Sequence, residues 1–240
     1  MVDLVEPLEW DSDFFGVPIA RADLNDPTAG TLRAIDAEAR AQGICCLYAT
    51  LEPTDETAPY LLQTFGYRLV EVSMDFERPG IPYTPRPSSS VVRPGAPADL
   101  PGLEPAIRTV AAWSRYAADR RFGPDAARRM HEAWAERAVH GTGERALFVA
   151  HDESGITGMA TFRRSQVPRI EFVGVTKPGA GVADALMVGF FEWGGGGPTE
   201  AGWMAARNIP VLRYVGRWGF RANRTRYVFH RWLDETEGPS

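Results

Sequence analysis

The feature that most constrains the fold of this chain is a predicted strand that runs directly into a glycine-rich turn and then into a helix. Residues 170–186 read Ile-Glu-Phe-Val-Gly-Val-Thr-Lys-Pro-Gly-Ala-Gly-Val-Ala-Asp-Ala-Leu. The first turn of a helix leaves backbone N–H groups unpaired, and together with the helix dipole these groups attract phosphate. Gly179 and Gly181 would let a phosphate approach the backbone closely. Taken alone, the motif also fits a turn that only reverses the chain.

The elements expected around this turn alternate between strands and helices, which indicates an α/β (α+β) fold. In the second half we expect helices from near residue 99 and over 124–141, 182–193 and 209–218, and strands at 91–93, 146–151, 157–163, 169–176, 201–205 and 227–233. In the first third we expect helices at 31–42 and 58–65, a turn over 11–16, and strands at 4–10, 17–22, 44–50 and 67–76.

A segment rich in Pro and Ser separates the two halves. It runs over residues 77–97 and carries the turn chemistry of a linker. We therefore expect an N-terminal domain over residues 1–80, a linker over 81–90, a C-terminal domain over 91–236 and a tail at 237–240.

Composition excludes several classes of function. The chain has 240 residues and a formal net charge of −5, which argues against nucleic acid as a partner. Its apolar runs are too short to span a membrane, and its first residues lack the layout of a signal peptide, so we expect a cytoplasmic protein without a membrane partner. Cys45 and Cys46 are adjacent and point to opposite faces of an expected strand, and no Cys–His spacing indicates a metal site.

Several stretches resemble the GNAT superfamily of acetyltransferases. Residues 175–186 are similar to its cofactor loop, which reads Arg/Gln-x-x-Gly-x-Gly/Ala and here contains Pro178, Gly181 and Ala183. Residues 208–220 are similar to its last helix and the Gly-Phe that follows. Stretches 8–16, 61–72 and 114–122 resemble the dTDP-fucosamine acetyltransferase branch of the superfamily.

The resemblance covers residues 8–233 and implies both a fold and an activity. The implied fold is a GNAT domain with a central mixed, mostly antiparallel sheet flanked by helices, preceded by a smaller, incomplete GNAT-like domain. The implied activity is transfer of an acyl group from acetyl-CoA or another acyl-CoA to the amine of a small acceptor. The favoured acceptor class is an amino sugar or a nucleotide-linked amino sugar.

The resemblance also implies which residues hold the cofactor. Backbone N–H groups along residues 172–175 would polarise the thioester carbonyl, as an oxyanion hole does. The implied cofactor-binding residues are Phe172, Val173, Val175, Lys177, Gly179, Ala180, Gly181, Val182, Ala183 and Asn208.

Two proton transfers need side chains, because the amine arrives largely as an ammonium and the leaving thiolate takes up a proton. Glu171 could remove the amine proton directly or through water; the alternative is a strand carboxylate paired with Arg169 or Arg163. The family's acid is a tyrosine four residues before the final Gly-Phe glycine, and Val215 stands there. Tyr214 is the candidate replacement, although adjacent helix residues project about 100° apart.

The cofactor loop departs from the family as well. Pro178 replaces an Arg and has no N–H to donate, and the adjacent Lys177 would restore the charge alone. These departures leave open an acyl carrier protein as donor, other thioester chemistry, or a binding role without catalysis. A homodimer is a further open possibility.

The segment around residues 113–122 is the candidate acceptor site. Arg115 could bind a diphosphate or carboxylate through paired hydrogen bonds, and Trp113 and Tyr116 could stack on a ring. Asp119 completes the substrate-binding candidates. The alternative is an ordinary helix end with one buried aromatic ring. The four histidines are interpreted as structural or surface residues: His131, His140, His151 and His230.

Overall fold

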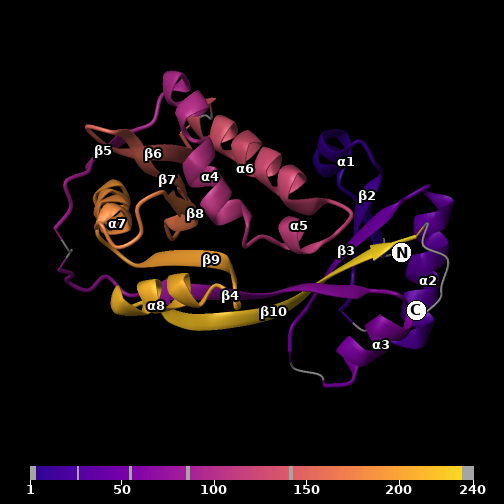
Figure 1. Ribbon diagram of the computed structural model, residues 1–240. Helices are drawn as coiled ribbons and strands as arrows, with labels where there is room; N and C mark the ends of the chain where they lie inside the picture. Colours follow the sequence, from indigo (N-terminus) through magenta and orange to yellow (C-terminus); the bar gives the residue numbers. More distant parts are fainter. Residues whose placement is uncertain (1–3, 26, 54–55, 85–86, 141–142, 234–240) are drawn as a thin grey trace. The chain divides into compact units, whose positions relative to one another are not determined.

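The computed structural model describes residues 4–25, 27–53, 56–84, 87–140 and 143–233, and the chain forms two compact units (Figure 1). Unit 1 contains residues 1–73 and 225–240, and unit 2 contains residues 74–224. Two strands, β4 (Arg68–Arg78) and β10 (Arg221–Trp232), contribute residues to both units. The predicted tail at 237–240 lies outside the described residues.

Unit 1 packs two helices against one face of a short sheet. Its elements are β1 (Val5–Pro7), α1 (Glu9–Phe15), β2 (Ile19–Ala22), α2 (Ala29–Ala41), β3 (Cys46–Leu51) and α3 (Ala58–Thr64). The strand order is β1-β2-β3-β10-β4, with β2 parallel to β3 and β10 antiparallel to β3. Leu32 and Ile35 of α2 and Leu62 of α3 are fully buried in a core with Leu47 and Phe229.

Unit 2 is the larger and holds the sheet predicted for the second half. Its elements are β5 (Val91–Pro94), the 3₁₀ helix η1 (Pro97–Gly102), α4 (Glu104–Ala111), α5 (Arg115–Ala118), α6 (Gly123–His140), β6 (Arg145–Asp152), β7 (Gly155–Arg163), β8 (Arg169–Val175), α7 (Val182–Trp193), β9 (Thr199–Ala205) and α8 (Ile209–Arg217). The strand order is β4-β9-β8-β7-β6-β5. Strands β5 to β8 are antiparallel neighbours and β8 is parallel to β9, so the predicted mixed, mostly antiparallel sheet is confirmed.

Helices cover both faces of this sheet. On one face α4 approaches β8 so closely that a side chain at Gly174 would collide with the carbonyl oxygen of Ala106. On the other face α7 lies over β7, where a side chain at Gly158 would come within 2.8 Å of Val182. The core beneath α7 and α8 includes Phe162, Leu186, Phe190, Val215 and Trp218.

The prediction for residues 8–16 is wrong: residues expected to end a strand and form a turn make the helix α1. Glu9 and Asp11 lie in its first turn, where carboxylates favour a helix, and Gly16 ends it in the left-handed conformation with φ 70°. The rings of Trp10 and Phe14, one turn apart, stack with centroids 5.4 Å apart. None of its residues is buried, so the sequence carries no inward-facing apolar stripe to reveal it.

The last strand also differs from its prediction. β10 begins at Arg221 rather than at residue 227, because its first residues are exposed and polar and give no alternating pattern. Its end pairs with β3 from Tyr227↔Leu51 to Trp232↔Cys46, so it completes unit 1. The contact units therefore divide the chain differently from the predicted boundaries at 80 and 91. Whether residues 91–236 fold alone stays a prediction.

Candidate functional site

Strands β8 and β9 diverge in the middle of unit 2. Within their described residues the two strands pair only at Arg169↔Glu200 and Ile170↔Ala201, whereas on its other side β8 pairs with β7 as far as Val175. The register between β7 and β8 shifts so that Phe162 faces Ile170 and Thr161 faces Phe172. Glu171 is thus the extra residue of a β-bulge. Beyond the bulge, one edge of β8 has no strand beside it, and its backbone groups can bind a ligand.

The loop after β8 places a helix N-terminus next to this edge. Thr176 donates from its backbone nitrogen and its hydroxyl to the carbonyl of Thr157, which fixes the start of the loop. Gly179 and Gly181 take φ values of 85° and 75°, which residues other than glycine rarely adopt. No side chain caps the N-terminus of α7, so its first N–H groups remain available to an anion.

The two glycines of this loop have different surroundings. A side chain at Gly181 would collide with the carbonyl oxygen of Pro87, so residues 87–88 lie directly against it. A side chain at Gly179 would meet no atom within 4 Å. Ala180 is exposed, and the side chain of Val182 is buried and anchors the first turn of α7. The open side of the loop is therefore at residues 179–180.

Two of the predicted cofactor residues have structural partners. The ammonium of Lys177 lies 2.7 Å from Asp152 Oδ2 and 2.7 Å from Ser154 Oγ, at the turn between β6 and β7. The hydrogen bond from Lys177, followed by those from the hydroxyl and the backbone nitrogen of Ser154, lowers the pKa of Asp152 to about 2. The Oδ1 atom of Asn208 accepts a hydrogen bond from the backbone nitrogen of Val211 and caps α8. The charge of Lys177 is thus already partly balanced beside the loop.

Glu171 belongs to an ion pair. Arg145 Nε lies 3.1 Å and 3.3 Å from its two carboxylate oxygens. The suggested pairing of Glu171 with Arg169 is wrong, because Arg169 instead binds Asp75 at 2.8 Å and Glu200 at 3.2 Å. The pair with Arg145 holds the carboxylate in place at the bulge.

Val215 and Tyr214 lie in different environments on α8. Val215 is 1% exposed and belongs to the core, so it offers no proton. The ring of Tyr214 lies 6.4 Å from the ring of Trp218, and the guanidinium of Arg217 lies 5.4 Å from its centroid. Burial, with the nearby carboxylate of Asp184, raises the pKa of Tyr214 above its ordinary value. The hydroxyl therefore stays protonated at neutral pH but is a weak proton donor.

The candidate acceptor segment contains both buried and accessible side chains. Tyr116 is 2% exposed and accepts a hydrogen bond of 2.8 Å from Arg115. Asp119 is also buried and accepts a hydrogen bond from the backbone nitrogen of Arg121. The guanidinium of Arg207, in the connection after β9, lies 5.4 Å from the ring centroid of Trp113. Tyr116 and Asp119 therefore shape the segment, whereas Trp113 and Arg115 lie toward the connection after β9.

The structure adds residues that the sequence did not single out for this site. His131 and Trp134 of α6 place their rings 5.3 Å and 6.2 Å from the ring of Phe172, at the bulge. Trp203 on β9 has a φ of 54° and lies 5.8 Å from the guanidinium of Arg115. The helical spacing of His131 and Trp134 places them on one face of α6, but no local pattern shows that this face meets the bulge.

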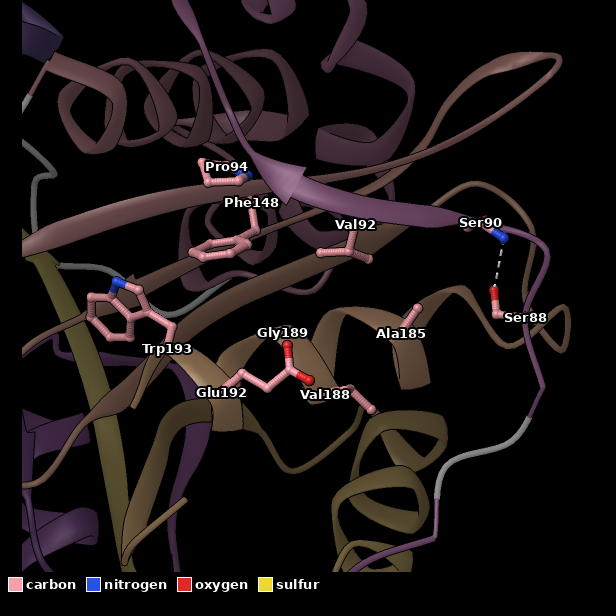
Figure 2. Close-up of a pocket in the computed structure, with 10 residues that line it drawn as sticks. All are labelled: Ser88, Ser90, Val92, Pro94, Phe148, Ala185, Val188, Gly189, Glu192 and Trp193. Carbon is pink, nitrogen blue, oxygen red and sulfur yellow. Dashed lines mark hydrogen bonds between the residues drawn. The ribbon is translucent and has the colours of Figure 1, made fainter. Parts of the chain in front are cut away.

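A cavity of about 570 Å³ lies between α7 and the strands β5 and β6. Figure 2 shows Ala185, Val188 and Glu192 of this helix beneath Val92 of β5 and Phe148 of β6. None of its described lining residues belongs to the predicted site. Among these described residues, none belongs to β8 or to residues 179–181, but Ser88, which lines the cavity, also lies against Gly181.

Solved structures share this architecture. A tandem GNAT protein from the clavulanic acid biosynthesis pathway superposes with a TM-score of 0.54 and 16% identity over 92% of this chain and 77% of its own. This chain has the GNAT fold. A GCN5-related N-acetyltransferase from Sphaerobacter thermophilus gives a TM-score of 0.57 and 14% identity, covering 90% of this chain and 73% of that protein. The predicted fold class is confirmed.

Sequence comparison finds a similar acetyltransferase. This chain is 27% identical over 225 residues to the dTDP-fucosamine acetyltransferase of Escherichia coli O6:H1, covering 93% of this chain and 91% of the relative. The resemblance recognised in the sequence is thereby supported along almost the whole chain. No family model matches the sequence.

Two further findings concern the described part of the chain. No helix there combines the length and the apolar character needed to cross a membrane. The same residues contain no group of three or more His, Cys, Asp or Glu side chains arranged to hold a metal ion.

Proposed function

We propose that this chain is an N-acyltransferase that moves an acyl group, with acetyl favoured, from a CoA thioester to the amine of a small acceptor. The observation that carries the proposal is the divergence of β8 from β9 at the bulge of Glu171, next to the uncapped N-terminus of α7. The edge of β8 beyond the bulge would offer backbone groups to the thioester and to the amide-containing arm of the cofactor. The N-terminus of α7 would offer N–H groups to the pyrophosphate. The favoured acceptor class is an amino sugar or a nucleotide-linked amino sugar, as in the similar acetyltransferase.

The residues present fit acyl-CoA at both ends. Gly179 and Ala180 have open space on the side where a pyrophosphate would approach, and no side chain competes for the first N–H groups of α7. The backbone of Phe172, Val173 and Val175 would hold the thioester arm along the free edge of β8. Bound acyl-CoA supplies the activated acyl group.

Glu171 and Tyr214 are the candidates for the two proton transfers, and the hydroxyl of Tyr214 is buried near Asp184. In amine acylation a C–N bond forms, a C–S bond breaks, the amine gives up a proton and the thiolate takes one up. Glu171, held by Arg145, would accept the amine proton directly or through water. Tyr214 is the candidate donor to the thiolate, and its raised pKa predicts slow proton transfer. Trp113, Arg115, Tyr116 and Asp119 would form or support the acceptor site.

A second function is favoured by one specific observation. The family's acid position holds Val215, which is buried in the core, and the pKa of its neighbour Tyr214 is raised. The chain could therefore bind a thioester without efficient acetyl transfer. Its donor could be an acyl carrier protein, its chemistry on the thioester could differ, or its role could be binding alone.

Calorimetric titration with acetyl-CoA tests the proposal. Desulfo-CoA and adenosine 3′,5′-bisphosphate separate the contributions of the thioester arm and the nucleotide. Micromolar binding followed by release of free thiol with an amine supports the enzyme. Micromolar binding without turnover on any amine supports the second function. No binding at millimolar concentration contradicts acyl-CoA as the donor and favours a carrier-protein donor or a role without catalysis.

A matched pair of substitutions at Ala180 tests whether the cofactor binds at the loop of residues 179–181. Ala180→Glu adds a negative charge at the open side of the loop, and Ala180→Lys adds a positive charge of similar length. We expect Ala180→Glu to weaken acetyl-CoA binding about tenfold and Ala180→Lys to leave it unchanged or tighter, because the interaction is with a pyrophosphate. Equal acetyl-CoA affinities in the two variants would contradict binding of the pyrophosphate at this loop.

A further inference from the structure

Trp203 has the most unusual backbone conformation near the diverging strands. Its φ is 54°, and it is the one residue other than glycine with a positive φ in the described part of the chain. The left-handed region is unfavourable for a bulky side chain, and such strain persists only where the surroundings enforce it. The indole is nevertheless 46% exposed, so packing in the core does not account for it.

Buried charges hold Trp203 in this conformation. Its backbone nitrogen donates to Asp75 Oδ1 at 3.0 Å, and the same oxygen accepts a bond of 2.8 Å from Arg169. Asp75 is 7% exposed, and Arg169 is fixed a second time by Glu200. The preceding Gly202 leaves no room for a side chain, because Asp75 and Arg169 fill that space. The strand is therefore built to turn the indole outward at this point.

The indole faces the candidate acceptor segment. Arg115 of α5 places its guanidinium 5.8 Å from the centroid of the Trp203 ring. Arg207, in the connection after β9, donates to the carbonyl oxygens of Ala112 and Ser114 at 3.4 Å and lies over Trp113. This connection is thereby tied to the acceptor segment. The exposed indole lies on β9, the strand that diverges from β8 just before Trp203.

We propose that Trp203 is the platform on which the ring of the acceptor stacks, and that it selects amines carried on a ring over open-chain amines. This inference rests on the proposed function, because it concerns the acceptor of the same reaction. A rigid indole offers a large apolar face with little loss of conformational freedom, and it stacks on flat or apolar ring faces. Strain retained at an exposed residue is typical of a binding position.

The test compares ring and open-chain acceptors. The panel contains amino hexoses with the amine at C2, C3 or C4, free and as nucleoside diphosphate conjugates, and the open-chain amino alditol that matches each free sugar. With acetyl-CoA as donor, we expect wild type to favour the ring form. Trp203→Ala should raise the acceptor KM about tenfold or more and leave acetyl-CoA affinity unchanged, and Trp203→Phe should recover most of the loss.

Trp203→Gly separates function from folding. It removes the same indole as Trp203→Ala, but glycine suits a positive φ, so this variant should melt about 2–4 °C higher than Trp203→Ala. Its acceptor KM should rise by the same factor as in Trp203→Ala. Tyr60→Ala, at an aromatic residue of α3 that is 74% exposed, is the matched surface control and should change neither property.

The outcomes distinguish failure of the proposed acyltransferase function from failure of the proposed role of Trp203. Failure of wild type to bind acetyl-CoA overturns the proposed function itself. Binding of acetyl-CoA together with a preference for open-chain amines, or with an unchanged KM in Trp203→Ala, overturns the role of Trp203 alone. Binding of acetyl-CoA without acylation of any ring amine overturns both the role of Trp203 and the favoured acceptor class.

Discussion

His131 brings an ionisable ring into the interior of unit 2. Its side chain is 4% exposed, and Nδ1 lies 2.7 Å from the carbonyl oxygen of Ala127, one turn earlier on α6. Since a carbonyl only accepts, Nδ1 carries the proton and Nε2 has the free electron pair. Burial is the main cause that lowers the pKa of His131 from 6.5 to about 4. The ring is therefore neutral at physiological pH.

This histidine should make the stability of the protein depend on pH. The unfolded chain takes up a proton below about pH 6.5, whereas the folded protein stays neutral until about pH 4. The contribution is therefore complete above pH 6.5 and is lost as the pH falls toward 4, by about 3 kcal/mol in total. Between pH 7.5 and pH 5, wild type should lose about 2 kcal/mol more free energy of unfolding than His131→Gln, measured in urea by tryptophan fluorescence. The same loss in both proteins would contradict this assignment.

At the residue scale, the sequence indicated which residue types matter, but it did not indicate the contacts that they make with residues distant in the sequence. Gly179 and Gly181 were singled out from sequence because glycine lets a ligand approach the backbone closely, and both adopt a positive φ. The partner of Glu171 was not predicted, because Arg145 comes from another strand and no local spacing joins the two. The strained backbone of Trp203 was not predicted, since it depends on Asp75, which is distant in the sequence.

Among the elements, α7 and α8 are joined by one buried carboxylate. Asp184 in the first turn of α7 is 4% exposed and accepts a hydrogen bond of 3.1 Å from Trp218 Nε1 at the end of α8. Arg217 lies 3.8 Å from the same oxygen. The carboxylate also lies at the positive end of the α7 dipole.

Removing this acceptor should loosen the two helices together. We expect Asp184→Ala to lower the free energy of unfolding by about 2 kcal/mol, because the buried indole N–H loses its partner. Asp184→Asn keeps a carbonyl oxygen and should lower it by less than half as much. Thermal unfolding of the two variants beside wild type measures the difference. Equal losses in both would assign the effect to charge alone.

Periodic elements of unit 2 were predicted closely, and short elements were not. The helices predicted at 182–193 and 209–218 agree with α7 and α8 almost to the residue. The four-residue helix α5 and the exposed helix α1 were missed, because neither is long enough or buried enough to show a repeat. The divergence of β8 from β9 follows from pairing between strands, which sequence periodicity does not record.

The two contact units of the chain meet within the strands β4 and β10, and the domain boundaries expected at 80 and 91 stay a prediction. No helix or strand forms in the described residues between β4 and β5, as predicted for a linker, but Tyr83 there packs on Phe191 and Trp218, with centroids 4.8 Å and 5.3 Å away. Composition identified an irregular segment correctly. It could not show that β4 continues to Arg78 or that β10 returns to β3.

Two fragments test this division. Residues 91–236 lack the part of β4 that belongs to unit 2 and carry the end of β10 without its partner β3, so we expect an aggregating or poorly ordered product. Residues 74–224 contain all of unit 2 and should give a dispersed NMR spectrum and a cooperative melt. A well-folded 91–236 fragment would instead support the domain boundaries predicted from sequence.

The return of β10 also sets an order of events during synthesis. β3 is made early, yet its neighbour on one side is residues 227–232, and Arg40 donates to the carbonyl oxygen of Leu233, 193 positions later. Unit 1 therefore cannot complete its sheet until residues 227–232 have been made, whereas residues 74–224 are available sooner. Such distant pairing is slow to form and leaves strand edges exposed meanwhile. The strands of residues 4–73 are thus made before unit 2 but receive their last neighbour after it, and a nascent chain stalled before residue 225 should expose β3 to chaperones and proteases.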